Sequence, residues 1–318
     1  MAINIVRYAS NGTTFWGVAH DGGIAPITGN YATTADFIAN AEPYWRAAAA
    51  AKPIVPFDRV TLLSPVTAPA RVLCQGANYR QHMIESGMDP DAKTFNMFFE
   101  KSDCAIAPPV GEVVRPAHVA LLDYEIELAL VFKTAITGPV TITAANIGDY
   151  VFGLTIANDI SARDVQIPQT QFFKGKSYRG FCPLGPYLAI LEPADFAWIE
   201  NLTLTLAVNG EVRQHDETRN LVYKPAESIT ELSTFSDVAP GDVLLTGTPS
   251  GCALHVPKPF VRKLMQLLLP EARLWAAFRS GQAKSPKYLK PGDVMTLTIA
   301  SADRVIDLGE QRTTVKAA

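Results

Sequence analysis

Apolar and polar residues alternate along the first twenty residues of the chain, a pattern that predicts paired β-strands. The two alternating runs flank Asn11-Gly12, a dipeptide that favours the tight turn of a β-hairpin. From Thr33 to Lys52 the apolar positions instead follow the spacing of an amphipathic helix, which Thr34 would cap and Pro43 would interrupt. We therefore expect the chain to begin with a small unit of strands and helix.

Four prolines between residues 53 and 69 mark the next segment. Proline lacks a backbone N–H donor, so this stretch suits an extended connector better than a core strand. We therefore place a domain boundary near residue 65. Residues 1–65 form a small N-terminal domain in this interpretation, and residues 66–318 form a larger one.

The larger domain is predicted to be rich in strands, because runs of Val, Ile, Leu and Thr are bounded there by Gly, Pro or Asn. These runs are Arg71–Gln75, Tyr124–Lys133, Val151–Asn158, Tyr187–Leu191, Leu202–Val208, Val243–Thr246 and Val294–Ile299. Asn209-Gly210 predicts a second hairpin. Apolar residues at helical spacing between Val261 and Arg279, cut by Pro270, predict a helical insert at about residues 253–287. The expected fold class is therefore α+β with a predominance of strands.

Composition and charge exclude several classes of protein. Of 318 residues, 48% are hydrophobic and 19% are charged, which is enough apolar material for a packed core. The 28 Lys and Arg residues against 31 Asp and Glu residues form no basic stripe, so we expect no nucleic-acid partner. No apolar run approaches the roughly 18 residues that span a bilayer, so we expect no membrane association. Four scattered cysteines and no secretory signal favour a reduced, cytoplasmic location.

Two carboxylates stand at the entrance of an apolar strand. Residues two apart share one face of a strand, so Glu125 and Glu127 are expected to project side by side. Their mutual repulsion calls for a cation, and hard oxygen ligands suit Mg²⁺, Mn²⁺ or Ca²⁺ better than Zn²⁺. A solvated strand with two outward charges is the alternative interpretation.

Further polar groups stand where other predicted strands end. Asp159 follows one strand, Lys176 lies in a basic loop flanked by glycines, and Thr248 belongs to a turn that offers hydroxyl and backbone N–H groups. His82 and Glu85 are three residues apart, close enough on a helical turn for the carboxylate to orient the imidazole as a general base. A solvated loop, an ordinary turn and a surface pair are the respective alternatives.

Taken together, seven ordered segments of the chain resemble the fumarylacetoacetate hydrolase family. They are Gly76–Glu85, Phe98–Lys101, Asp123–Leu128, Asn158–Gln166, Lys176 with Cys182–Pro186, Val208–Gln214 and Pro240–Pro249. The resemblance favours the branch of bacterial acylpyruvate and diketo-acid hydrolases. It implies a β-rich roll of mixed sheets as the catalytic domain, beside a smaller N-terminal domain, and it implies a homodimer.

The resemblance also implies roles for individual residues, matched position by position. A divalent cation, Mg²⁺ or Mn²⁺, would be held by the metal ligands Glu125, Glu127 and Asp159. Lys176 would contact a substrate oxygen, and His82 with Glu85 would activate a water molecule. The residues expected to bind the substrate are Tyr79, Arg163, Gln166 and Thr248.

The reaction implied by the resemblance is hydrolysis of a carbon–carbon bond in a β-diketo acid, within the degradation of aromatic or related compounds. Water activated by His82 would attack one carbonyl, and the departing enolate would be stabilised at the metal. Decarboxylation, isomerisation or hydration of keto acids and opening of lactones are alternatives that use the same carboxylates. A non-catalytic binding protein is a less favoured one. The His82 and Glu85 pair favours hydrolysis, because a decarboxylase needs no activated water.

The chain departs from the family pattern after Pro249. Many relatives continue there with a short glycine-rich loop, whereas this chain leads into the predicted insert. The insert could serve as a lid or as an interface. His255 could reach the site from it, although a packing or surface position is the interpretation we favour.

Overall fold

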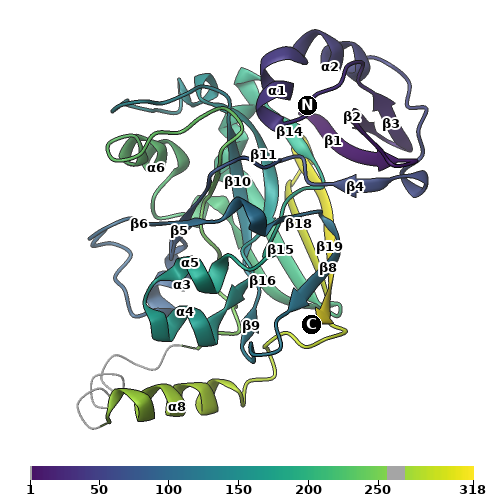
Figure 1. The fold of residues 1–318 in the computed structure, drawn as a ribbon. Helices are drawn as coiled ribbons and strands as arrows, with labels where there is room; N and C mark the ends of the chain where they lie inside the picture. Colours follow the sequence, from purple (N-terminus) through teal and green to yellow (C-terminus); the bar gives the residue numbers. More distant parts are fainter. Residues whose placement is uncertain (1, 256–268) are drawn as a thin grey trace.

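The computed structural model describes residues 2–255 and 269–318, and it is built around two β-sheets (Figure 1). The strands of the larger sheet are β1 (Ile3–Ser10), β2 (Thr13–His20), β3 (Gly23–Pro26), β4 (Thr61–Leu63), β5 (Val72–Gly76), β6 (Met97–Lys101), β10 (Ile126–Phe132), β11 (Val151–Asn158), β14 (Leu188–Ile190) and β17 (Val243–Leu245). The strands of the smaller sheet are β8 (Val110–Arg115), β15 (Leu202–Val208), β16 (Glu211–Glu217), β18 (Val294–Ser301) and β19 (Asp307–Ala317).

The larger sheet runs in the order β3-β2-β1-β14-β11-β10-β17-β5-β6, with β4 also paired to β1. The smaller sheet runs in the order β16-β15-β18-β19-β8. Two short pairs complete the β-structure, and they are β9 (Leu122–Asp123) with β12 (Ser161–Ala162) and β7 (Ile106–Ala107) with β13 (Cys182–Pro183). The predicted α+β class with a predominance of strands is confirmed.

The helices are short and lie outside the sheets. The α-helices are α1 (Thr34–Asn40), α2 (Glu42–Ala49), α3 (Arg80–Glu85), α4 (Arg163–Gln169), α5 (Phe172–Lys176), α6 (Pro225–Leu232) and α8 (Glu271–Gln282). The 3₁₀ segments are η1 (Phe57–Arg59), η2 (Asp103–Ala105), η3 (Ile147–Asp149), η4 (Pro193–Asn201) and η5 (Thr218–Asn220). Among the described residues, no helix has both the length and the apolar character needed to cross a membrane.

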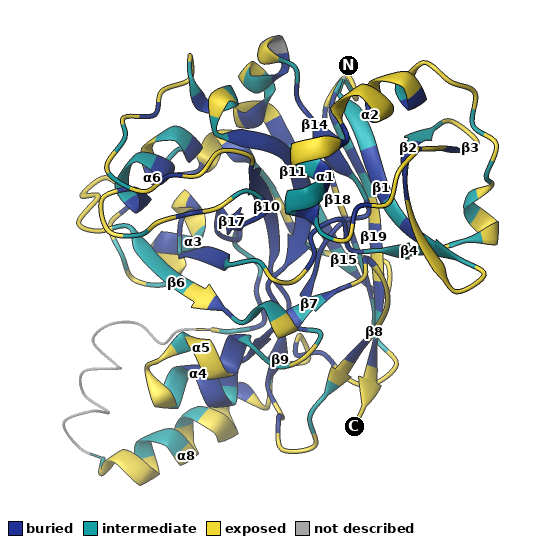
Figure 2. Ribbon diagram, turned by 45° about the horizontal axis from the view of Figure 1, so that its top comes forward, coloured by how far each residue is buried: buried dark blue, intermediate teal, exposed yellow. Residues whose placement is uncertain are grey.

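The core lies between the two sheets. Every residue of β10 and β11 is buried, and these strands contact β15, β18 and β19 of the smaller sheet. Figure 2 shows the central strands as buried and the outer faces of the helices as exposed. A strand covered on both faces needs apolar residues, which explains the unbroken apolar run Leu128–Phe132 after Glu127.

The N-terminal unit continues the larger sheet. Its first strand pairs antiparallel with β14, which in turn pairs with β11. The hairpin predicted at Asn11-Gly12 is confirmed, and both residues adopt the positive φ that its turn requires. The predicted helix is interrupted next to Pro43, as expected, but Thr33 caps it instead of Thr34. The Thr34 hydroxyl instead points into the interior, where it donates to the carbonyl oxygen of Pro65.

All seven strands predicted for the larger domain are present within two residues of their expected bounds. The hairpin at Asn209-Gly210 is also confirmed. The sequence did not predict β6, β8 or β19. Of the expected insert, residues 256–268 lie outside the described residues, whereas α8 begins directly after Pro270 and confirms the second half of the helical pattern.

The close approach of β14 to β11 depends on Gly153, which has no side chain. This contact leads to a prediction about stability. A methyl group at Gly153 would collide with the carbonyl oxygen of Ala189 on β14. We expect Gly153→Ala to lower the free energy of unfolding by about 1–3 kcal/mol. Urea denaturation measures the loss. Gly138→Ala is the matched control because nothing lies within 4 Å of its added methyl group; equal stability of both variants would contradict the close-packing argument.

Candidate functional site

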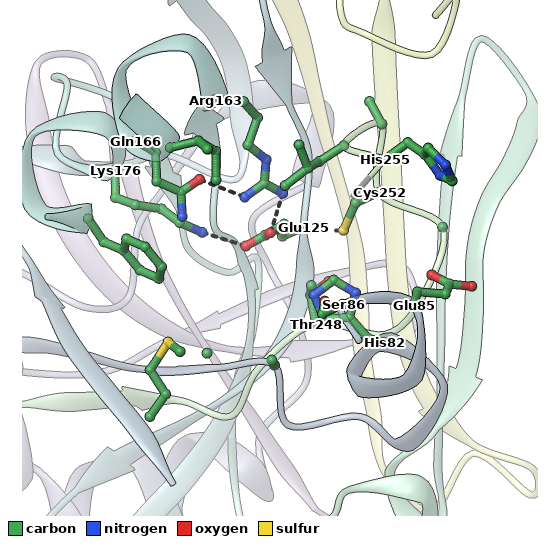
Figure 3. A pocket seen from close by; sticks show the side chains of 18 of the residues that line it. His82, Glu85, Ser86, Glu125, Arg163, Gln166, Lys176, Thr248, Cys252 and His255 are labelled. Carbon is green, nitrogen blue, oxygen red and sulfur yellow. Dashed lines mark hydrogen bonds and ion pairs between the residues drawn. The ribbon is translucent and has the colours of Figure 1, made fainter. Parts of the chain in front are cut away.

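A cavity of about 770 Å³ lies beside the start of β10. Its walls come from α3, α4 and α5, from the loop after β17 and from the ends of the insert (Figure 3). Cavities of this size are typical of sites for small organic ligands. Eight of the ten predicted site residues belong to the cavity wall, and these are His82, Glu85, Glu125, Glu127, Arg163, Gln166, Lys176 and Thr248.

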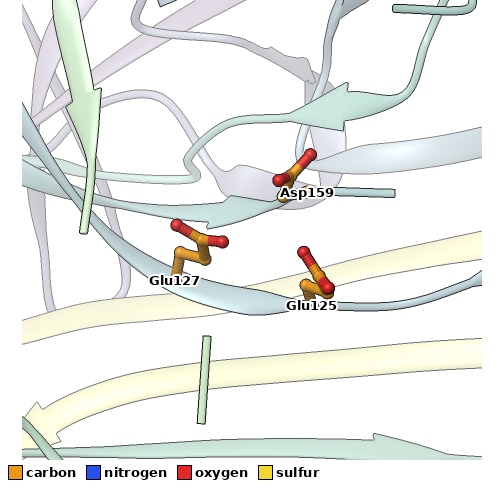
Figure 4. A group of neighbouring side chains, drawn as sticks. All are labelled: Glu125, Glu127 and Asp159. Carbon is orange, nitrogen blue, oxygen red and sulfur yellow. The ribbon is translucent and has the colours of Figure 1, made fainter. Parts of the chain in front are cut away.

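The three predicted metal ligands lie together in the interior (Figure 4). Carboxylate oxygens of Glu125, Glu127 and Asp159 lie within 4.8 Å of one another. The sheet register explains the cluster, because Ile126 at the start of β10 is paired with Asn158 at the end of β11. The residue that follows Asn158 therefore meets the two glutamates at the entrance of β10.

Three buried cations surround these carboxylates. The Lys176 ammonium lies 2.5 Å from Glu125 Oε2 and 2.6 Å from Asp159 Oδ2. Lys101 pairs with the other oxygen of Asp159 and donates to the carbonyl oxygens of Ile160 and Phe181. All three cations, Lys101, Arg163 and Lys176, are almost inaccessible to solvent.

Arg163 joins the triad to a fourth buried carboxylate. Its guanidinium donates to Asp123 Oδ2 at 2.8 Å, to Glu125 Oε1 and to Gln166 Oε1 at 2.9 Å. Figure 3 shows Lys176 and Arg163 converging on Glu125, with Gln166 beside them. Since its donors are used in this way, Arg163 fixes the geometry of the site.

Two glycines allow the surrounding segments to approach the triad. Gly175 packs against α4, where an added Cβ would lie 2.7 Å from the backbone nitrogen of Gln166, so α5 can bring Lys176 inside. Gly247 has a φ of +91°, a conformation that favours glycine, and its N–H donates to Glu127 Oε2 at 2.7 Å. The loop after β17 therefore holds one oxygen of Glu127.

The ionic pairs set the charge states of the site. Burial alone raises the pKa of Glu125, but Arg163 and Lys176 outweigh it and hold that pKa below its usual range. Burial lowers the pKa of Lys176, but Asp159 and Glu125 outweigh it and raise that pKa above its usual value. Lys176 therefore carries a positive charge at neutral pH.

Glu127 is the carboxylate without a cationic partner. Among the described residues it forms no ion pair, and burial together with Asp159 and Glu125 raises its pKa well above the usual range. Four buried carboxylates thus face three buried cations. A divalent cation would supply the missing charge, and an all-carboxylate set of ligands fits Mg²⁺, Mn²⁺ or Ca²⁺. The residues present therefore fit a bound divalent metal.

His82 and Glu85 lie on α3 at the cavity wall. Burial lowers the pKa of His82 although Glu125 opposes the shift, so the imidazole is neutral at neutral pH. Glu85 accepts a hydrogen bond from Gln81, and no hydrogen bond joins it to His82 in the described part of the chain. The sequence-based pairing of these two residues is therefore not formed in this structure.

Two other predicted residues have different surroundings. Thr248 lines the cavity, but its hydroxyl donates to the carbonyl oxygen of Ile126 and accepts from Gln214. Tyr79 is completely buried and does not contribute to the cavity wall. His255 lies at the wall in an exposed position.

Asp123, Lys101 and Cys252 belong to the site but were not predicted from the sequence. Asp123 lies two positions before Glu125, so the same strand alternation could have placed it with the other acids. Lys101 lies within one of the family-like segments, but its partner Asp159 is 58 residues away. Cys252 is buried at the cavity wall, with its sulfur 3.9 Å from Glu125 Oε1.

Comparison with known families covers nearly the whole chain. Residues 71–316 match the model described as "Fumarylacetoacetate (FAA) hydrolase C-terminal", and residues 4–65 match the model described as "Rv2993c-like, N-terminal". The chain is 36% identical to the mitochondrial oxaloacetate tautomerase Fahd2a of Rattus norvegicus, across 69% of this chain and 68% of that protein.

Two further similar proteins come from bacteria. The oxaloacetate tautomerase YisK of Bacillus subtilis is 38% identical, across 64% of this chain and 67% of that one. A solved structure from Mycobacterium abscessus, described as a "probable 2-hydroxyhepta-2,4-diene-1,7-dioate isomerase", superposes with a TM-score of 0.72 at 30% identity. The superposition covers 100% of this chain and 99% of the other chain.

These relatives correct one prediction. Hydrolysis of a carbon–carbon bond was the reaction expected from the sequence, but the similar proteins are named tautomerases and an isomerase. The reason for the error lies in the site. Tautomerisation and hydrolysis both place negative charge on an enolate oxygen, so the same carboxylates and cations serve either reaction.

Metal binding at the triad generates a second prediction. We expect Mg²⁺ or Mn²⁺ to raise the melting temperature, since a ligand at 100 times its dissociation constant adds about 2.7 kcal/mol to stability. Glu127→Gln should abolish this shift, while the metal-free variant should melt no lower than the unchanged protein because a buried repulsion is removed. Thermal unfolding with and without EDTA measures both effects. Glu310→Gln, an exposed position, is the control; a full metal shift in Glu127→Gln would place the metal elsewhere.

Proposed function

Because the chain belongs to the fumarylacetoacetate hydrolase family, we propose that it is a metal-dependent tautomerase of a dicarboxylic 2-oxo acid such as oxaloacetate. The observation that carries this proposal is the buried triad of Glu125, Glu127 and Asp159 beside Lys176, within a cavity of about 770 Å³. The names of the two similar tautomerases support the choice of reaction.

The proposed reaction moves one proton within the substrate. In the direction from keto to enol, a proton leaves C3 and a proton arrives on the oxygen at C2. Negative charge therefore grows on that oxygen in the transition state, while no carbon–carbon bond breaks and no water is consumed. The site needs a positive environment for the oxygen and a base near C3.

The triad and its neighbours match the first requirement. Glu125, Glu127 and Asp159 would hold the divalent cation, which when bound supplies Lewis-acid stabilisation of the enolate oxygen. Lys176 is charged and lies at the triad, so it can donate a hydrogen bond to the same oxygen. Arg163 keeps Glu125 in place through its hydrogen bond.

His82 matches the second requirement. Its imidazole is neutral because burial lowers its pKa, so it can accept the C3 proton and return it to the substrate. It lies at the cavity wall on α3, below Glu125 in Figure 3. The role of base does not depend on Glu85, which makes no hydrogen bond to His82 in the described structure.

Charge balance supports an acidic substrate. Three buried cations and a divalent ion together exceed the four buried carboxylates by one positive charge. An anionic acid would neutralise this excess in a site where water screens charges weakly. We include Mg²⁺ or Mn²⁺ as the metal because its ligands are all carboxylate oxygens.

The cellular setting is also part of this proposal. All four cysteines are free thiols, which is consistent with a reducing compartment such as the cytoplasm. A homodimer is the proposed assembly, and measuring the mass in solution tests it.

The test is an assay of oxaloacetate tautomerisation, in which the loss of enol absorbance monitors the reaction. The metal-loaded protein should accelerate the reaction well beyond the same concentration of metal in buffer. Glu127→Gln should lose this acceleration together with metal binding. A rate equal to that of free metal would exclude the proposed function.

The pH dependence provides a prediction for His82. Only a neutral imidazole can accept a proton. Because the pKa of His82 is lowered, we expect kcat/KM to stay constant through the ordinary titration range of histidine and to decline only at lower pH. We expect His82→Gln to reduce kcat by about 10²–10⁴-fold and to remove this acidic limb. His215→Gln is the control, since His215 is exposed and bonded to Thr205. An unchanged pH profile in His82→Gln would exclude His82 as the base.

A further inference from the structure

Resting on the proposed function, we propose that Lys287 is a specificity-determining residue of the cavity. Its ammonium group would receive the distal carboxylate of a 2-oxo dicarboxylic acid whose chain is longer than that of oxaloacetate. The observations that carry this inference are the anchored ends of the insert, the ammonium group of Lys287, which has no partner among the described residues, and the place of Lys287 in the wall of the cavity that the triad also lines.

The outgoing end of the insert is tied to the buried charges. The Asp123 carboxylate accepts hydrogen bonds from the backbone N–H groups of Ala253 at 2.8 Å and Leu254 at 3.0 Å. The same carboxylate is bound to Arg163, which is bound to Glu125. The start of the insert therefore has a defined position relative to the triad.

The returning end of the insert is tied to the outgoing end. Gln282 donates to the carbonyl oxygen of His255 at 2.6 Å and accepts from its N–H at 3.2 Å. The Tyr288 hydroxyl also donates to Gln282, and the N–H of Leu289 donates to the carbonyl oxygen of Leu122. Lys287 thus stands between anchored residues, and it contributes to the cavity wall together with Ser285 and His255.

Lys287 differs from the other cations of the cavity. Lys176 and Arg163 are engaged by Glu125, Asp159 and Asp123. Lys287 is exposed, and its backbone N–H donates to the Ser285 hydroxyl, whereas its ammonium group forms no ion pair or hydrogen bond within the described residues. Its charge is therefore available to an anionic group of a ligand.

Apolar side chains also line this cavity. The apolar residues of the wall include Met97, Phe99, Ile167 and Phe172. They lie on β6, α4 and α5, the elements that also carry the three buried cations. A cavity of about 770 Å³ is several times larger than a four-carbon acid needs. An acid with a 2-oxo carboxylate at one end, an apolar chain and a second carboxylate at the other end matches a wall that combines the triad, these apolar side chains and Lys287.

The test compares two ligands of equal chain length. In 2-oxoadipate the chain ends in a carboxylate, and in 2-oxohexanoate it ends in a methyl group. Dissociation constants are measured by calorimetry with Mg²⁺ present, on the unchanged protein, Lys287→Gln and Lys284→Gln. Lys284 is exposed on the same segment and is not part of the cavity wall, so it controls for the loss of surface charge.

We expect the unchanged protein to bind 2-oxoadipate at least about tenfold more tightly than 2-oxohexanoate, which corresponds to about 1.4 kcal/mol. Lys287→Gln should lose most of this preference, and Lys284→Gln should keep it. Equal binding of the two acids, absence of binding, or the same loss in both variants would overturn the assignment.

Oxaloacetate tautomerisation by the same preparations separates this inference from the proposed function. Tautomerisation without a preference for the dicarboxylate would remove the role of Lys287 and leave the proposed function standing. A preference that depends on Lys287, in a protein that does not tautomerise oxaloacetate, would establish the carboxylate site and overturn the proposed reaction.

Discussion

The burial of four carboxylates with only three cations is the constraint on which this structure depends. Charges removed from water are stable only when they are paired and hydrogen-bonded, and breaking one such pair costs several kcal/mol. Lys101, Arg163 and Lys176 meet this requirement for three acids, whereas Glu127 relies on one backbone N–H. Helix α4 supplies Arg163, helix α5 supplies Lys176, and the loop after β17 supplies the backbone N–H that binds Glu127.

The same network of ion pairs and hydrogen bonds connects the triad to the insert that lines the cavity. Asp123 binds Arg163 on one side and the backbone of the insert on the other. A single carboxylate thereby relates the position of the triad to the position of the insert ends in the cavity wall. In the proposed function, the triad and the insert would hold the two ends of the acid, and Asp123 would connect them.

Much of this arrangement could be predicted from local patterns, and the exceptions have physical reasons. Strand alternation placed Glu125 beside Glu127, and the end of an apolar run identified Asp159. The partners of these acids could not be found in this way, because the pairing of Lys101 with Asp159 depends on the tertiary fold. The type of reaction was predicted incorrectly because an enolate-stabilising site does not reveal which bond changes. The parallel pairing of β8 with β19 also escaped prediction, because it joins strands almost 200 residues apart.

The pairing of β14 has a consequence for how such proteins can diverge. This strand has only three residues, yet it hydrogen-bonds to β1 on one side and to β11 on the other. Without residues 1–65, β14 would become an edge strand, and an exposed edge strand can pair with other chains and promote aggregation. The N-terminal unit therefore occupies the hydrogen-bonding edge of β14. A relative with a different N-terminal segment would need another way to protect this edge.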